Sequence, residues 1–197
     1  MMKEGRKGFT LVELLIVIVV IGILAGMMML SSTEAVSSAK ATRIISDLTV
    51  LKKAVISWYT DNYERVEPQY NSGEKRNDYL VKVGNSSYHL GVFAKDHGGQ
   101  KEFVKYLGSS NKITLTKDNS TKPGEYLLAT EGNEWFVGYD VGNDMRLREK
   151  LAGRAKSLKL QGATKRLKKD GSLDTNTDNI HLYSTADQKV YMLILTF

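Results

Sequence analysis

The sequence predicts an α+β protein in which a long N-terminal helix packs on an antiparallel sheet. Three observations support this fold class. Residues 9–30 form a nearly continuous apolar run, and residues 31–61 contain neither glycine nor proline while their apolar residues recur at helical spacing. After residue 110, short apolar and aromatic runs alternate with turn residues, as in antiparallel strands. The 197 residues include two prolines and no cysteine, so no disulfide can stabilise the head.

The first thirty residues predict a membrane helix preceded by a basic leader. About 20 apolar residues are enough to cross a bilayer, and the run over residues 9–30 meets this length. Lys3, Arg6 and Lys7 precede it and are offset only by Glu4. Positive charge favours the cytoplasmic side, so we expect a precursor in the cytoplasmic membrane with its C-terminal part outside.

A carboxylate near the start of the apolar run is unusual, because it costs about 2.5–3.5 kcal/mol in a membrane unless it has a partner. Glu13 lies in the stretch GFTLVEL, Gly8–Leu14, after a basic leader. This stretch resembles the prepilin motif of type IV pilins and related pseudopilins. The resemblance implies that a membrane peptidase removes residues 1–8 by cleavage between Gly8 and Phe9 and methylates Phe9. It also implies that Glu13 pairs with the amine of Phe9 on a neighbouring subunit. The other interpretation is an ordinary signal anchor with a stray glutamate.

The resemblance further implies a pilin fold and polymerisation into a helical filament of identical subunits. The implied partners are the prepilin peptidase, the pilus assembly machinery in the inner membrane and other copies of the chain. The assembled subunits would lie in a filament on the cell surface. Many type IV pilins carry a proline near the position of Leu30, so its absence here puts a kink at that point in doubt.

The second half of the helix, residues 31–61, is predicted to be amphipathic and to lie across a globular head formed by residues 62–197. A helix from Phe9 to about Asp61 would be roughly 80 Å long. Gly22 and Gly26 lie four residues apart in its apolar half, a spacing that permits close helix packing or local melting, or that has no special role. The predicted buried stripe consists of Ala41, Ile44, Ile45, Leu48, Leu51, Val55, Trp58 and Tyr59.

The head is predicted to begin with a polar loop over residues 62–100 and to continue as a sheet. Glu131, Gly132 and Asn133 separate two apolar runs and predict a hairpin at the centre of that sheet. The last eight residues are almost continuously apolar, which predicts an interior strand that forms a terminal hairpin with the run at 180–184. The other predicted elements are strands at Tyr79–Val83, His89–Phe93 and Ile113–Thr116, a short helix at Gln100–Leu107, and hairpin strands at Tyr126–Thr130 and Trp135–Val141.

Residues 144–169 predict an amphipathic helix with Asn143 or Asp144 as its cap, followed by a basic stretch. This segment contains ten lysines and arginines. It could bind DNA, an anionic surface or a neighbouring subunit, or it could be a solvated helix face. The candidate patch consists of Lys165, Arg166, Lys168 and Lys169.

One segment has the composition of a metal site. Asp174, Asn176 and Asp178 alternate along a polar stretch, a spacing that suits the oxygen ligands of calcium. The stretch loosely resembles the calcium loop of major type II secretion pseudopilins. The alternative is a polar turn capped by its own Asp and Asn side chains. No other cofactor is expected.

No catalytic motif is present, and the three histidines, His89, His97 and His181, lack metal-ligand spacing. The sequence therefore predicts a structural subunit of a type IV pilus and not an enzyme. The alternatives are a pseudopilin of a type II secretion or competence DNA-uptake system, or a membrane-anchored binding protein that keeps residues 1–8.

Overall fold

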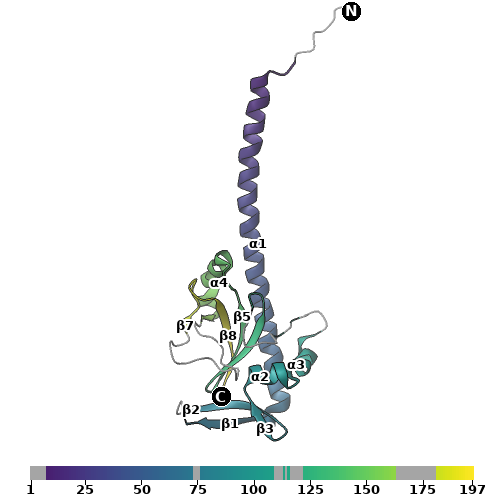
Figure 1. Cartoon of the computed structure of the whole chain (residues 1–197), viewed down its shortest axis with the longest axis vertical. Helices are drawn as coiled ribbons and strands as arrows, with labels where there is room; N and C mark the ends of the chain where they lie inside the picture. The colour runs from purple at the N-terminus through teal and green to yellow at the C-terminus, as the bar shows by residue number, and fades with distance from the viewer. Residues whose placement is uncertain (1–7, 73–75, 109–112, 114, 116–121, 163–180) are drawn as a thin grey trace, which may run out of the picture.

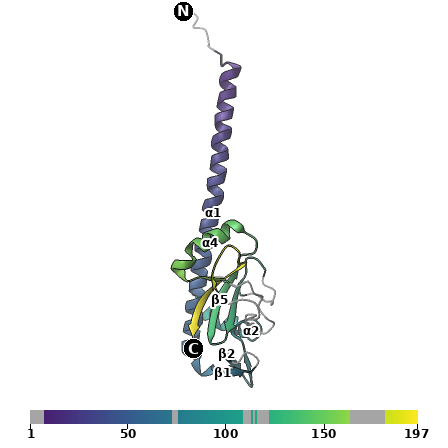
Figure 2. The same ribbon diagram turned by 90° about the vertical axis from the view of Figure 1, so that its left-hand side faces the viewer.

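The computed structural model describes residues 8–72, 76–108, 113, 115, 122–162 and 181–197. Its dominant element is helix α1, Leu11–Asn62, which ends next to the predicted Asp61 and continues into a short 3-10 turn, η1, Tyr63–Arg65. At 1.5 Å per residue, α1 is about 78 Å long. Its first half projects alone from the head, and its second half runs along the head (Figures 1 and 2).

The main sheet has five strands in the order β4-β5-β8-β6-β7. The predicted hairpin is confirmed, since β4, Tyr126–Glu131, and β5, Glu134–Asp140, are antiparallel and joined at Gly132 and Asn133. Its predicted position at the centre is wrong for β4, which pairs within this sheet with β5 alone. The central strand is β8, Lys189–Thr196, as expected for a nearly continuous apolar run.

The predicted terminal hairpin is wrong. Strand β7, His181–Leu182, does not pair with β8, because β6, Gln161–Gly162, lies between them and pairs with both. The pairing of β8 explains the difference, because β5 takes one of its edges and β6 takes the other, so neither is left for β7. In the turn after β7, the buried Asp187 carboxylate accepts hydrogen bonds from the Ser184 backbone N–H at 2.8 Å and its Oγ at 2.9 Å.

The segment predicted as a polar loop contains a second, smaller sheet and helix α2, and the strand predicted at Tyr79–Val83 is confirmed as part of this sheet. The antiparallel sheet consists of β1, Val66–Asn71, β2, Arg76–Val83, and β3, Ser86–Tyr88. The strand predicted at His89–Phe93 is wrong, because this segment begins helix α2, Leu90–Asp96. Leu90, Phe93 and Ala94 are buried at i, i+3 and i+4, which is helical and not strand spacing.

Two further helices complete the head. The predicted helix near Gln100 is confirmed as α3, Gly99–Leu107, which ends at Gly108. The predicted helix after Asp144 is confirmed as α4, Met145–Leu158, and the Asp144 side chain caps it by accepting from the Leu147 N–H at 3.1 Å. Ile113 and Leu115 are buried, but Leu115 makes only an isolated bridge to Tyr126, and neighbouring residues of that predicted strand lie outside the described part.

The core forms where the second half of α1 meets the sheet and helices α2, α3 and α4. The predicted stripe faces this core, with Ile45 and Tyr59 only partly buried. Trp58 contacts the rings of Phe93 and Phe103 at centroid distances of 5.1 Å and 5.3 Å. Trp135 is fully buried and belongs to this core. Burial of this stripe fixes α1 to the head.

Candidate assembly site

The exposed N-terminal end of α1 is organised by Thr10 and Glu13. Thr10 is the N-cap, and its Oγ1 accepts from the Glu13 N–H at 3.3 Å. The Glu13 carboxylate in turn accepts from the Thr10 N–H and from its hydroxyl, each at 2.8 Å. This reciprocal arrangement is a capping box, which satisfies orphan donors of the first helical turn. In a single chain, the Glu13 carboxylate therefore already accepts hydrogen bonds from the backbone and the side chain of Thr10.

The apolar half of α1 is uncovered. Its large apolar residues between Phe9 and Met29 are 47–84% exposed, whereas the stripe on the second half is buried. Among the described residues, α1 is the helix long and apolar enough to cross a membrane by length and composition. Such a surface requires lipid or other apolar helices around it, because uncovered apolar surface of this extent is unfavourable in water.

Gly22 and Gly26 lie four residues apart, and so on the same side of this apolar half. A Cβ placed on either residue would meet nothing within 4 Å, so each position is open to an approaching helix. The α-helix is continuous through both glycines and through residue 30. The structure therefore has no helix break near residue 30, and the predicted roles of the two glycines in packing or melting stay predictions.

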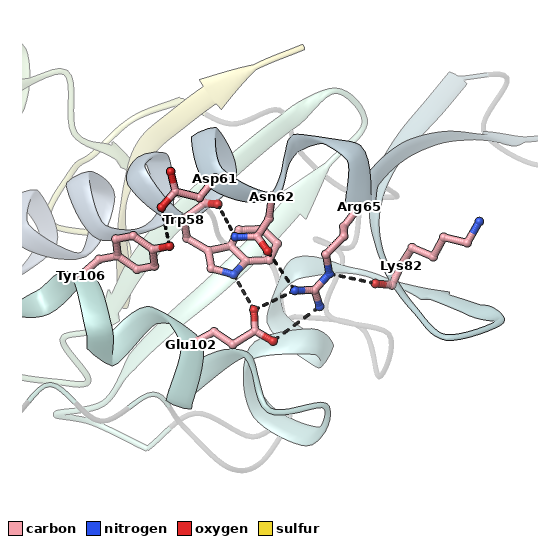
Figure 3. A network of polar contacts seen from close by, with 7 residues as sticks. All are labelled: Trp58, Asp61, Asn62, Arg65, Lys82, Glu102 and Tyr106. Atoms are coloured by element: carbon pink, nitrogen blue, oxygen red, sulfur yellow. Dashed lines mark hydrogen bonds and ion pairs between the residues drawn. The ribbon is translucent and has the colours of Figure 1, made fainter.

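The opposite end of α1 is tied to the head by a polar network centred on Glu102 of α3 (Figure 3). Its Oε2 accepts from the Trp58 indole N–H at 2.6 Å and from the Arg65 guanidinium at 2.9 Å. The same guanidinium lies 5.5 Å from the Trp58 ring and 5.4 Å from the Phe93 ring. Tyr106 donates to Asp61 at 2.7 Å, and this hydrogen bond raises the pKa of the Tyr106 hydroxyl. The network fixes the end of α1 against α3.

At the other end of the head, α4 contacts α1 just past its apolar half. Lys150 Nζ lies 2.6 Å from Glu34 Oε1, and this contact lowers the pKa of the Glu34 carboxyl. Arg154 donates to Thr42 Oγ1 at 2.8 Å and to Ser38 Oγ at 3.3 Å. One ion pair and two hydrogen bonds to neutral side chains therefore link α4 to α1 at this crossing.

The predicted site residues are only partly brought together. Phe9 and Glu13 lie at the N-terminal end of α1, and Thr10 is a hydrogen-bond partner of Glu13 that the sequence analysis missed. The spacing Thr10-x-x-Glu13 is itself the capping-box pattern and could have identified it. Two predicted sets lie outside the described residues, namely Asp174, Asn176 and Asp178, and Lys165, Arg166, Lys168 and Lys169. Within the described residues, no group of three or more His, Asp or Glu side chains could hold a metal.

The side chains around Asp187 hold a turn in place and do not form a catalytic arrangement. His181 Nε2 lies 2.9 Å from its carboxylate, and Ser184 Oγ donates to it at 2.9 Å. A serine nucleophile would need the histidine as its own partner, but here both side chains bond to the same buried carboxylate. The arrangement closes the β7–β8 turn.

Comparison with known proteins identifies a known motif at the start of α1. Residues 5–29 match the family model described as the prokaryotic N-terminal methylation motif. A fimbrial protein of Pseudomonas aeruginosa is 31% identical over 114 residues, which cover 55% of this chain and 72% of the relative. A type IV major alpha-pilin of Moraxella bovis is 36% identical over 84 residues, or 43% of this chain and 53% of the relative.

Similarity also extends to a secretion protein. The type II secretion system core protein G of Klebsiella michiganensis is 32% identical over 62 residues, which cover 32% of this chain and 44% of the relative. No solved structure matches the chain.

Proposed function

Because this chain belongs to the type IV pilin family, whose members are structural subunits and not enzymes, we propose that it is a membrane-anchored precursor that polymerises into a surface filament through α1. The observation that carries this proposal is the division of α1 into an uncovered apolar half and a half buried in the head. Residues 11–30 of this helix span about 30 Å, the thickness of a bilayer hydrocarbon core. The same surface can exchange lipid for neighbouring helices during assembly.

The processing step in this proposal is cleavage between Gly8 and Phe9 with N-methylation of Phe9. Both residues are exposed, and Phe9 lies outside the helix, which begins at Leu11. An extended, uncovered backbone is accessible to a peptidase. The leader of residues 1–8 would remain in the cytoplasm until it is removed.

The assembly step uses the Glu13 carboxylate. In the single chain, Glu13 accepts two bonds from Thr10 at 2.8 Å. We expect the new amine of Phe9 on a neighbouring subunit to add a positive charge to this carboxylate. A charge pair inside apolar surroundings is much stronger than in water, so it would set the register between subunits. Gly22 and Gly26 would permit the close approach of their helices.

The test is intact mass and N-terminal sequencing of material sheared from the cell surface. We expect a chain that starts at Phe9 and is one methyl group heavier than its unmodified mass. A chain that keeps Met1 and stays in the membrane would contradict the proposal. Glu13→Ala should prevent filament formation and leave the head folded, because Glu13 contacts no residue of the head. Thr10→Ala is the matched control, since it removes the cap and keeps the carboxylate.

A second candidate, a secretion pseudopilin, is favoured by the similarity to the type II secretion core protein. It predicts short filaments confined to the cell envelope and loss of protein export on deletion. Sheared surface filaments in a deletion background complemented with this chain would contradict it.

Two proposals about ligands rest on residues outside the described part. Calcium binding by Asp174, Asn176 and Asp178 predicts a rise in melting temperature with calcium that disappears in Asp174→Ala with Asp178→Ala. DNA binding by the basic patch predicts that reversing Lys165, Arg166, Lys168 and Lys169 lowers the affinity and its salt dependence. Unchanged melting or unchanged salt dependence would contradict the respective proposal.

A further inference from the structure

Helix α4 is the part of the head nearest to the apolar half of α1; it lies beside α1 in Figure 1 and crosses it in Figure 2. Lys150 bonds to Glu34, and Arg154 bonds to Ser38 and Thr42. These contacts fix the position of α4 along α1. They therefore also fix its distance from any membrane that surrounds residues 11–30.

That distance matches the headgroup layer. Glu34 lies four residues past residue 30, which is about 6 Å along the helix axis. The headgroup regions extend roughly 5–8 Å beyond the hydrocarbon core on each side. When residues 11–30 lie in the hydrocarbon core, Lys150, which contacts Glu34 at 2.6 Å, lies at the depth of the headgroups.

The charge of this region suits an anionic surface. Arg146, Lys156 and Lys159 are exposed on α4 and at its C-cap, and Lys150 keeps 32% of its side chain exposed beside Glu34. Glu149 and the capping Asp144 are the exposed acids of the same segment. The apolar side chain of Met145 is 52% exposed at the first position of the helix. Basic and apolar side chains at one surface are typical of a helix that lies on lipid.

We propose that α4 docks on anionic phospholipid headgroups of the membrane that holds α1 and keeps the head against this surface before assembly. The inference rests on the proposed membrane precursor. It goes beyond it by naming α4 as a second, electrostatic membrane contact. Each basic residue near an anionic leaflet strengthens binding about fivefold, and salt weakens the contact.

The absence of cysteine makes a direct test straightforward. Gly153 is exposed on α4, and a Cβ there would meet nothing within 4 Å. Gly153→Cys therefore provides one fluorophore site on the full-length chain. The chain is reconstituted into phosphatidylcholine vesicles with or without phosphatidylglycerol, together with a lipid that carries a nitroxide quencher on its headgroup. We expect quenching in the anionic vesicles that decreases with salt, and little quenching in the neutral ones.

The charge-reversed variant is Arg146→Glu with Lys156→Glu, for which no side-chain hydrogen bond is present among the described contacts. Its matched control is Lys101→Glu with Lys105→Glu on α3, which packs near Trp58, about 36 Å farther along α1 than Glu34. We expect the docked-to-free ratio to fall at least about 25-fold in the first variant and to stay unchanged in the control.

The outcomes separate the two proposals. A chain that alkaline carbonate extracts from the vesicles is not inserted, and this result would overturn both the membrane precursor and the docking. An inserted chain whose label is equally quenched in neutral and anionic lipid, or is insensitive to the reversal at positions 146 and 156, would overturn the docking alone. Quenching that appears only at high protein density would identify a neighbouring subunit as the partner and would also overturn it.

Discussion

Replacing Glu102 by alanine removes the acceptor that joins α3 to the end of α1. In the native chain this carboxylate accepts the Trp58 indole N–H at 2.6 Å and the Arg65 guanidinium at 2.9 Å (Figure 3). The indole side chain is buried, so its N–H would lose a partner that water cannot fully replace. The guanidinium would stay over the Trp58 and Phe93 rings without a counter-charge.

The expected cost follows from these two contacts. A hydrogen bond to a charged group contributes about 1.5–3 kcal/mol. The ion pair is discounted because the Arg65 and Glu102 side chains are 33% and 30% exposed, and such pairs contribute at most about 1 kcal/mol. We therefore expect Glu102→Ala to lower the free energy of unfolding by about 2–4 kcal/mol. For a chain of this size, this corresponds to a fall in Tm of about 4–16 °C.

The assay is thermal and denaturant unfolding of the full chain in detergent, followed by tryptophan fluorescence. Lys101→Ala is the control, because it removes an exposed charge from the same helix and should change stability by less than about 0.5 kcal/mol. Glu102→Gln should recover part of the loss, since an amide oxygen can still accept from the indole. If Glu102→Ala were as stable as Lys101→Ala, the network would not fix the end of α1 and the reasoning would fail.

Three further predictions concern the sheet and α4. Asp187→Ala should lower the free energy of unfolding by about 2–4 kcal/mol in guanidinium titrations, because the partly buried N–H and Oγ of Ser184 would both lose their acceptor; an unchanged midpoint would contradict the assigned turn. Gly138→Ala should cost about 1–3 kcal/mol, since its Cβ would lie 2.7 Å from the Tyr191 ring, whereas Gly153→Ala should stabilise α4 by about 0.5–1 kcal/mol. Equal Tm values for these two variants would refute this packing. Finally, burial, reinforced by the hydrogen bond to Asp47, raises the pKa of Tyr126, and burial also raises the pKa of Tyr191. As the pH rises, these tyrosine hydroxyls lose their protons in the unfolded chain before they do so in the folded chain. Their contribution to the free energy of unfolding is therefore fully present below about pH 10 and falls as the pH rises above it. Urea titrations at pH 8 to 11 would detect this fall, and a constant midpoint would argue against it.

Local sequence patterns were enough to predict the helices α1 and α4. The apolar run predicts that α1 begins near Phe9, and the buried stripe through Trp58 gives its contact face. The Asp144 cap similarly predicts the start of α4. In each case the signal lies within a few turns of one helix, so no distant contact is needed to interpret it.

Short apolar runs were harder to interpret. The run after His89 has three buried residues at i, i+3 and i+4, yet it is too short for periodicity alone to separate strand from helix. In the structure it is a helix whose Phe93 packs against the Trp58 ring of α1. The hairpin of β1 and β2 was similarly hidden, because Glu67, Pro68 and the charged residues that follow indicate a loop, whereas an edge strand tolerates them.

The sequence by itself determined that this chain has a long helix with an apolar half for lipid or filament and a buried half for a head. Only the tertiary structure decided which strands are neighbours in that head and which charges meet across it. Strand β6 lies between β7 and β8 because Gln161 and Gly162 pair with both. Glu102 accepts a hydrogen bond from Trp58, 44 residues away, because α3 packs against α1. Such contacts join segments far apart in the chain, and their free energy depends on the whole packed arrangement and not on local sequence.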